Sequence, residues 1–135
     1  MDMSDLDMIL AGKTILVIDD DPDSLEIAQT LLIKTKVNVV TAQDGAQALK
    51  ILDATRPDYI ISDLSMPNMS GWELIKIIKA ERQWMDIPIF ALTAHAMAGD
   101  RVKAIAAGFH NYLTKPLNPS TFINDLLKLI HQLPS

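Results

Sequence analysis

The sequence predicts a doubly wound α/β fold, in which helices cover both faces of a parallel five-stranded sheet. Five short runs are apolar with little alternation, as expected of strands buried on both faces; they cover residues 15–18, 37–40, 59–62, 87–92 and 109–114. Segments with helical spacing of apolar residues separate these runs. Right-handed crossovers between parallel strands then give a three-layer helix–sheet–helix sandwich. A length of 135 residues suits one such domain.

The first two helices have recognisable starts. The first run ends at three aspartates, of which Asp21 can cap a helix whose first residue is Pro22, where a missing N–H costs nothing. After the second run, Asp44 with Gln47 three positions later resembles a capping box and predicts another helix. Residues 56–58, Arg-Pro-Asp, end that helix before the third run.

The remaining three helices are marked in the same way. Ser70 with Glu73 forms a second candidate capping box. Residues 98–107 are expected to form a helix that stops at Gly108, a residue suited to a left-handed C-cap. The pair Asn118-Pro119 is expected to cap and start the last helix.

Composition excludes several classes of function. The net charge of −5 argues against nucleic acid or an anionic membrane as a direct partner. The absence of cysteine excludes disulfides, thiolate chemistry and Cys-ligated zinc. No apolar stretch approaches the ~20 residues of a membrane span, and residues 1–5 are acidic where a signal peptide is basic. We therefore expect a cytoplasmic protein.

Carboxylates follow two of the predicted strands. Asp19 and Asp20 come directly after the first run, and Asp63 comes directly after the third. In open α/β sheets the carboxyl ends of the strands form the ligand-binding edge. Adjacent carboxylates repel and lose hydration there, and hard oxygen ligands suit Mg²⁺. A magnesium site explains these residues better than three solvated turn aspartates.

Other residues at this edge have ordinary explanations when taken singly. Thr93 suits a strand, and Lys115 suits a surface. Together, at the ends of the fourth and fifth runs, a hydroxyl donor and an ammonium can both reach a phosphoryl group on a third strand end. Three methionines nearby are interpreted as loop packing rather than as a partner-binding stripe, namely Met66, Met69 and Met97.

The segment 63–71, Asp-Leu-Ser-Met-Pro-Asn-Met-Ser-Gly, resembles the phosphoacceptor segment of receiver domains in two-component response regulators. The resemblance covers residues 12–133 and leaves 1–11 as an N-terminal extension that is expected to be flexible. It implies a flavodoxin-like fold with strand order 2-1-3-4-5, for which a member of this family is a standard example. It extends, in the family's order, to Asp19-Asp20, Thr93-Ala94, Tyr112 and Lys115-Pro116.

The resemblance assigns roles to the clustered residues. Asp63 is the residue that accepts phosphate from a phosphohistidine. Mg²⁺ (or Mn²⁺) is bound by Asp20 directly and by Asp19 through water, with Asp63 and the main-chain carbonyl of Ser65 completing the protein ligands. Lys115 pairs with Asp63 and later with its phosphoryl group.

The resemblance also implies a switch. Thr93 moves to hydrogen-bond a phosphoryl oxygen, and Tyr112 swings inward into the space that this opens. The Lys115–Pro116 bond is expected to be cis. The surface formed by the fourth helix, the fifth strand and the fifth helix then changes, and it binds a downstream protein. Ser65 and His95 vary across the family and set the lifetime of the phosphate.

The leading hypothesis is a stand-alone signalling switch, not a turnover enzyme, that receives phosphate from a histidine kinase or a histidine phosphotransfer protein. Its oligomeric state is expected to be a monomer or a weak dimer, with no nucleic acid and no membrane as partner. A second hypothesis keeps the chemistry and makes the chain the receiver segment of a hybrid histidine kinase.

A phosphatase of the haloacid dehalogenase type is a competing hypothesis of another class, because a strand there also ends in Asp-x-Asp, as at 19–21. That family carries threonine or valine where this chain has Asp23, and it usually needs a larger chain with a cap. Phosphorylation of Asp63 indicates a receiver, whereas phosphorylation of Asp19 indicates a phosphatase. Flavin binding is less favoured, because no Gly- and Thr-rich loop follows the first strand.

Overall fold

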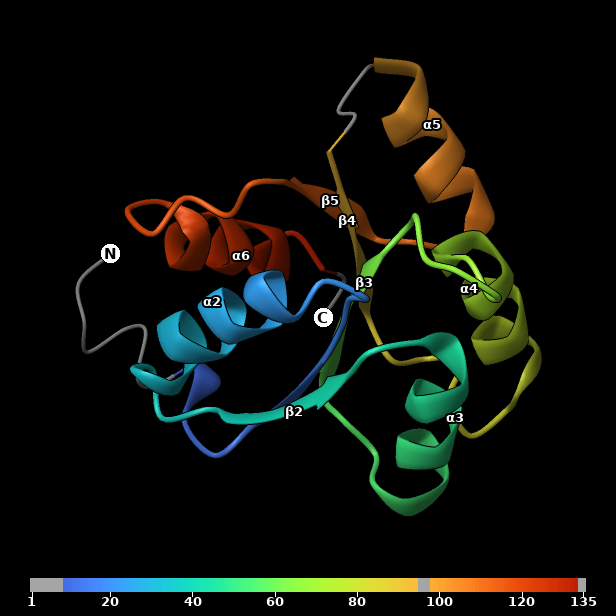
Figure 1. The fold of residues 1–135 in the computed structure, drawn as a ribbon, viewed down its shortest axis with the longest axis horizontal. Helices are drawn as coiled ribbons and strands as arrows, with labels where there is room; N and C mark the ends of the chain where they lie inside the picture. Colours follow the sequence, from blue (N-terminus) through green and yellow to red (C-terminus); the bar gives the residue numbers. More distant parts are fainter. Residues whose placement is uncertain (1–8, 95–97, 134–135) are drawn as a thin grey trace.

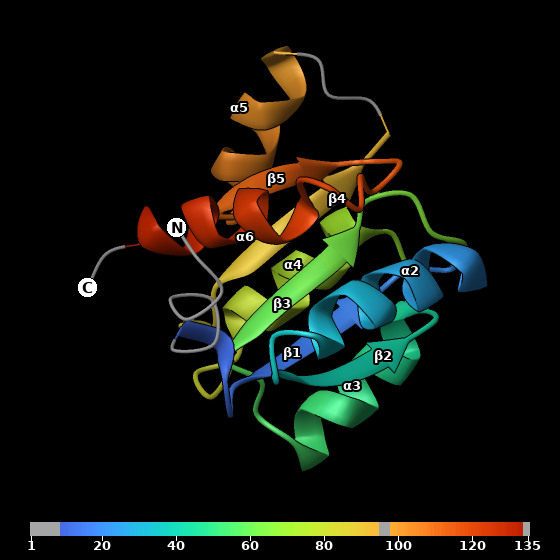
Figure 2. The ribbon, with the colours of Figure 1, turned by 90° about the vertical axis from the view of Figure 1, so that its left-hand side faces the viewer.

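The predicted α/β fold is confirmed by a computed structural model, which describes residues 9–94 and 98–133. The sheet has five strands, all parallel, in the order β2-β1-β3-β4-β5, and Figure 2 shows them side by side in that order. Their bounds differ from the predicted runs by one or two residues; they are β1 Thr14–Ile18, β2 Asn38–Ala42, β3 Tyr59–Asp63, β4 Ile89–Thr93 and β5 Asn111–Thr114.

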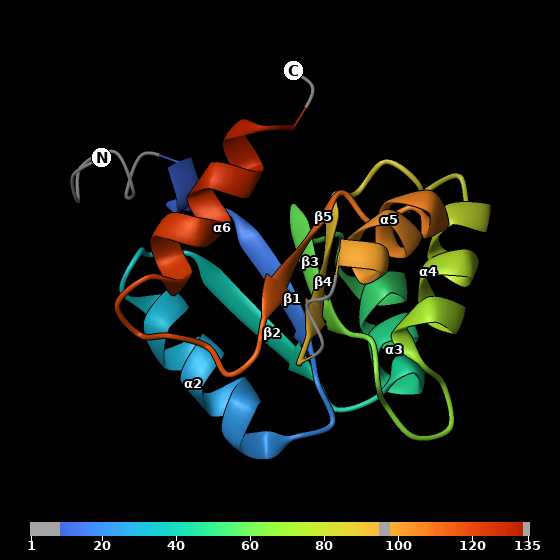
Figure 3. The same cartoon turned by 90° about the horizontal axis from the view of Figure 1, so that it is seen from above.

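Five helices lie between and after the strands (Figure 1). They are α2 Pro22–Ile33, α3 Gly45–Ala54, α4 Gly71–Ala80, α5 Ala98–Ala107 and α6 Phe122–His131. Seen from above, α2 and α6 cover one face of the sheet, and α3, α4 and α5 cover the other (Figure 3). This is the three-layer sandwich that the alternation of strands and helices predicts.

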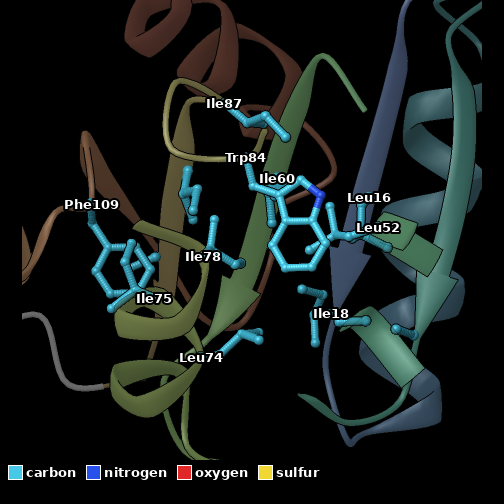
Figure 4. Close-up of a cluster of buried hydrophobic side chains, with 14 of the residues drawn as sticks. Leu16, Ile18, Leu52, Ile60, Leu74, Ile75, Ile78, Trp84, Ile87 and Phe109 are labelled. Atoms are coloured by element: carbon cyan, nitrogen blue, oxygen red, sulfur yellow. The ribbon is translucent and has the colours of Figure 1, made fainter. Parts of the chain in front are cut away.

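Each face of the sheet has its own hydrophobic core. On the α2–α6 face, Phe90 and Leu126 are fully buried. On the opposite face, Leu16, Ile60 and Ile78 are buried around Trp84, which lies in the loop between α4 and β4 (Figure 4). Burial of apolar side chains on both sides explains why the strands read as almost continuous apolar runs.

The three predicted N-caps are confirmed. Asp21 Oδ1 accepts from the Asp23 N–H at 3.0 Å, and Asp44 Oδ1 accepts from the Gln47 N–H at 2.8 Å. Ser70 Oγ accepts from the Glu73 N–H at 3.2 Å, and its hydroxyl faces Glu73 Oε1 at 3.4 Å. Each cap satisfies an N–H that the first turn of a helix leaves unpaired.

The predicted start of the last helix at 118–119 is wrong, because α6 begins at Phe122 and residues 119–121 form a turn. The Asn118 side-chain oxygen accepts from the Ser120 N–H at 2.9 Å, and Thr121 makes no side-chain cap. Asn118 therefore organises an Asx turn ahead of the helix.

The chain is anchored before β1. Of the predicted extension 1–11, the structure describes residues from Ile9 onward, where Leu10 is fully buried and Ile9 packs against the α2–α6 core. Across residues 9–94 and 98–133, no helix is long and apolar enough to cross a membrane.

Candidate functional site

The sheet register brings the predicted site residues to one edge. Ile18 pairs with Ser62, Asp63 with Leu92, and Thr93 with Thr114, so the carboxyl ends of β1, β3, β4 and β5 lie close together at one edge. The ladder continues past β1, where the N–H of Asp19 donates to Ala42 O at 3.0 Å. Backbone pairing therefore fixes where Asp19 and its neighbours leave the sheet.

Lys115 holds two buried carboxylates together. Its Nζ lies 2.8 Å from Asp19 Oδ2 and 3.0 Å from Asp63 Oδ2. Asp19 is 0% exposed and Asp63 is 5% exposed, whereas Lys115 is half-buried. The N–H of Lys115 donates to Thr93 O at 2.8 Å, which ties the lysine to the end of β4.

The second oxygen of each buried carboxylate binds a backbone N–H. Asp19 Oδ1 accepts from the Asp21 N–H at 3.0 Å, and Asp63 Oδ1 accepts from the Ser65 N–H at 3.1 Å. Each aspartate is thus held by the turn that follows its own strand. Both side chains have one fixed orientation before any ligand binds.

The electrostatics of the site leave it short of positive charge. Burial raises the pKa of Asp19, and the charge of Asp63 adds to that shift, although hydrogen bonds from Lys115 and the Asp21 N–H oppose it. Burial alone would lower the pKa of Lys115, but its hydrogen bonds and attraction to Asp19 and Asp63 outweigh burial and raise this pKa. One ammonium therefore serves two buried carboxylates, and the neighbouring Asp20 adds a third carboxylate at the same edge.

The three carboxylates fit a hard divalent cation. Asp19, Asp20 and Asp63 each offer an oxygen, and these oxygens lie within 4.8 Å of one another. Oxygen ligands of one octahedral Mg²⁺ lie about 3 Å apart when adjacent and about 4.2 Å apart when opposite, so the three carboxylates are close enough to converge on one ion. Asp20 is exposed, which leaves an open side for water or phosphate oxygens.

Thr93 and Tyr112 lie on the paired strands β4 and β5. Thr93 is buried at the end of β4, next to the Lys115 backbone. Tyr112 is half-buried in β5 opposite Ala91 and packs against the core under α3, α4 and α5. The Lys115–Pro116 bond is cis, as predicted. The Ser65 side chain is exposed, and His95 lies outside the described residues.

Sequence reasoning missed the role of two glycines. Gly71 packs so closely on the backbone after β3 that a Cβ there would lie 2.2 Å from the Asp63 carbonyl oxygen. A Cβ on Gly45 would lie 2.4 Å from the sulfur of Met69. Both glycines are the first residue of a helix, directly after a predicted cap, but nothing in the sequence shows what lies against them.

Comparison with known proteins gives a consistent family. A model of the response regulator receiver domain matches residues 15–127. A protein of Leptolyngbya boryana, described as an uncharacterized 14.6 kDa protein in the sodA1 3' region, is 37% identical over 123 residues, or 91% of this chain and 91% of that protein. The sensor protein GacS of Pseudomonas syringae pv. syringae is 36% identical over 117 residues, which cover 84% of this chain and 13% of GacS.

Solved structures agree with this match. The chemotaxis response regulator CheY4 of Vibrio cholerae superposes with a TM-score of 0.82 at 32% identity, over 89% of this chain and 98% of that one. The receiver domain of the sensor histidine kinase PA1611 from Pseudomonas aeruginosa PAO1 superposes with a TM-score of 0.78 at 31% identity, over 90% of this chain and 100% of that one. The PA1611 structure has a magnesium ion coordinated in its active site cleft.

Proposed function

Because this chain belongs to the family of response regulator receiver domains, we propose that it is a phosphoacceptor switch in a two-component phosphorelay, with Asp63 as the acceptor. The observation that supports this most directly is the pairing of Asp63 with Lys115 beside Asp19 and Asp20 at the carboxyl edge of the sheet. A phosphoryl group is an anion, and it needs cationic partners at the residue that receives it.

Asp19, Asp20 and Asp63 would hold Mg²⁺, with the main-chain carbonyl of Ser65 as a further ligand. The bound ion would neutralise the carboxylates and the incoming phosphoryl oxygens. The PA1611 receiver, which has a magnesium ion at its cleft, supports this part of the proposal.

The transfer itself uses the residues around Asp63. An Asp63 carboxylate oxygen attacks the phosphorus of a phosphohistidine, the new P–O bond forms as the P–N bond breaks, and the imidazole leaves. The Ser65 N–H and Lys115 orient the Asp63 carboxylate for this attack, since they bind its two oxygens at 3.1 and 3.0 Å. Lys115 then moves from pairing with the carboxylate to pairing with the phosphoryl oxygens.

The output surface in this proposal is formed by α5, β5 and α6. Thr93 would bind the phosphoryl group, and Tyr112 would follow it inward. Tyr112 lines a pocket of about 330 Å³ between these elements, together with Arg101, Asn111, Asp125, Lys128 and other residues. On α5, Val102 is 69% exposed and Ile105 is 48% exposed. Exposed apolar side chains beside charged ones suit a contact with a protein partner.

The donor is a histidine kinase or a histidine phosphotransfer protein. The match to a segment of GacS keeps the second hypothesis, a receiver segment of a hybrid histidine kinase, alongside a stand-alone switch. Both hypotheses use the same chemistry at Asp63. The haloacid dehalogenase hypothesis requires Asp19 as the nucleophile, and Asp19 is fully buried with Lys115 on one oxygen and a backbone N–H on the other.

The proposal is tested by incubating the protein with a small-molecule phosphodonor and Mg²⁺ and measuring its intact mass. Wild type should gain the mass of one phosphoryl group, and Asp63→Asn should not. Asp53→Asn is the matched control, because Asp53 is an exposed aspartate on α3. Equal labelling of wild type and Asp63→Asn would contradict the assignment of Asp63.

A further inference from the structure

The loop between β3 and α4 carries the backbone groups on which the proposed site depends. The Ser65 N–H binds Asp63 Oδ1 at 3.1 Å at the start of the loop. The N–H of Met69 donates to Pro67 O at 2.7 Å, and the N–H of Gly71 donates to Leu64 O at 3.0 Å. The loop is therefore a closed turn whose conformation sets the position of the Ser65 backbone.

A methionine sulfur joins this loop to the neighbouring helix. Met69 Sδ occupies the space of a side chain at Gly45, because a Cβ there would lie only 2.4 Å from the sulfur. Gly45 is the first residue of α3, so the contact links the β3–α4 loop to the start of α3. Asn68, with φ of 69°, turns the chain just before Met69. The half-buried Met69 side chain also packs against the core under α3, α4 and α5.

This contact depends on the sulfur being apolar. Oxidation of methionine to its sulfoxide turns an apolar, flexible side chain into a polar, chiral one, and it disrupts the packing that the thioether made. A sulfoxide oxygen on Met69 would need both room and a hydrogen-bond donor. The bare α-carbon of Gly45, beside which the sulfur lies, has no polar atom that could donate to that oxygen.

We propose that Met69 is an oxidation site for hydroperoxides, and that its sulfoxide releases the β3–α4 loop from Gly45 and weakens the metal and phosphoryl site. The sulfur lone pair attacks one peroxide oxygen, the S–O bond forms as the O–O bond breaks, and the other oxygen leaves as water or an alcohol after taking a proton. The sulfur loses two electrons and the peroxide gains them. Methionine sulfoxide reductases reverse the change, one enzyme for each epimer.

The inference rests on the proposed function, since its consequence is measured at the proposed Mg²⁺ site. Released from Gly45, the loop holds the Ser65 backbone less firmly beside Asp63, whose Oδ1 accepts from the Ser65 N–H. Changes in groups that orient metal ligands typically cost 10- to 100-fold in metal affinity. We expect about a tenfold loss of Mg²⁺ affinity, with a parallel loss in the rate of Asp63 phosphorylation at subsaturating Mg²⁺.

Met85 provides the internal control. It is 45% exposed, and it lies in the loop after α4, before the start of β4 and away from the carboxyl edge of the sheet. Met85 is expected to oxidise readily and without effect on the site. Met66 is half-buried on the same loop as Met69, and its oxidised fraction is measured in the same experiment.

The test compares wild type, Met69→Leu and Met85→Leu before and after treatment with hydrogen peroxide. Peptide mass spectrometry gives the oxidised fraction of each methionine, calorimetric titration gives Mg²⁺ affinity, and each protein is compared with its own untreated sample. Wild type and Met85→Leu should lose affinity about tenfold in proportion to Met69 oxidation and regain it after treatment with both reductases. Met69→Leu should keep its affinity.

Three results would overturn the inference. In the first, Met69 stays reduced while Met85 is fully oxidised. In the second, Met69 is oxidised but the Mg²⁺ affinity does not change. In the third, Met69→Leu loses as much Mg²⁺ affinity after peroxide treatment as wild type does. Failure of untreated wild type to bind Mg²⁺ or to be phosphorylated is a different outcome. It would overturn the proposed function, and the inference with it.

Discussion

Replacing Gly71 with alanine should damage both the stability of the fold and the proposed metal site. Gly71 and Gly45 each open a helix, α4 and α3, after a side-chain cap, and both are buried. Neither has a positive φ, so alanine is allowed by the backbone at both positions. They differ in what lies against them: the Asp63 carbonyl and the Leu64 Cα for Gly71, and the flexible end of Met69 for Gly45.

The magnitude follows from the contact distance. The new Cβ on residue 71 would lie 2.2 Å from the Asp63 carbonyl oxygen, whereas ordinary carbon–oxygen contacts begin near ~3.3 Å, so backbone must move by about 1 Å. Overpacking of this kind lowers the free energy of unfolding by about 1–3 kcal/mol. Alanine also restricts the backbone of the unfolded chain more than glycine does, which raises this free energy by about 0.4–1 kcal/mol. We expect Gly71→Ala to lower the free energy of unfolding by about 1–2 kcal/mol net, or Tm by roughly 4–10 °C.

The assay is thermal unfolding of wild type, Gly71→Ala and Gly45→Ala without metal, followed by Mg²⁺ titration. Gly45→Ala should change stability by less than about 1 kcal/mol, because a methionine end can move aside where a backbone carbonyl cannot. The Mg²⁺ affinity of Gly71→Ala should also fall, since the displaced backbone belongs to Asp63. A Gly71→Ala protein as stable as Gly45→Ala, with wild-type Mg²⁺ affinity, would refute the reasoning from this contact.

Three further predictions concern charge and the switch. Asp20→Asn should raise the Tm measured without metal, because it removes one of the repelling carboxylates. It should also reduce the rise in Tm that Mg²⁺ causes, because it removes a metal ligand. A Tm without metal below that of wild type would show instead that Asp20 stabilises the fold. Burial and the charge of Lys79 lower the pKa of His110. As the pH falls, His110 is therefore protonated in the unfolded chain before it is protonated in the folded one, and stability should fall as the pH drops below about 6.5. Urea unfolding of His110→Gln should lack this part of the pH dependence. Thr93→Ala and Tyr112→Ala should still accept phosphate on Asp63 but show a smaller effect of phosphorylation on partner affinity; a full effect in a binding titration of Thr93→Ala would argue against coupling through the hydroxyl.

The sequence predicted the strands and the site edge well, because their signals are local. A strand buried on both faces must be apolar throughout, so the polar residue that ends it, such as Asp19 or Asp63, marks the edge of the sheet. The caps of α2, α3 and α4 were equally local, since each involves residues only two or three positions apart.

The errors and omissions arose where several local patterns or distant segments compete. Asn118 can cap a helix or form an Asx turn with its bond to the Ser120 N–H, and it forms a turn here because α6 begins only at Phe122. Phe109 was assigned to a strand, but its N–H donates to Ala104 O at 3.0 Å and closes the C-terminal cap of α5 after Gly108, whose φ is 115°. The bridge from Lys115 to Asp19 and the approach of Gly71 to Asp63 depend on tertiary packing, which residue spacing does not specify.

The central claim is that Asp63 is the residue phosphorylated and that the carboxylate cluster requires a divalent cation for this reaction. The most direct measurement maps the phosphorylated aspartate by peptide mass spectrometry after incubation with a small-molecule phosphodonor, once with Mg²⁺ and once with excess chelator. The account predicts a phosphoryl group on Asp63 with Mg²⁺ and little or none with chelator. Phosphorylation at Asp19, or undiminished labelling of Asp63 in chelator, would contradict it.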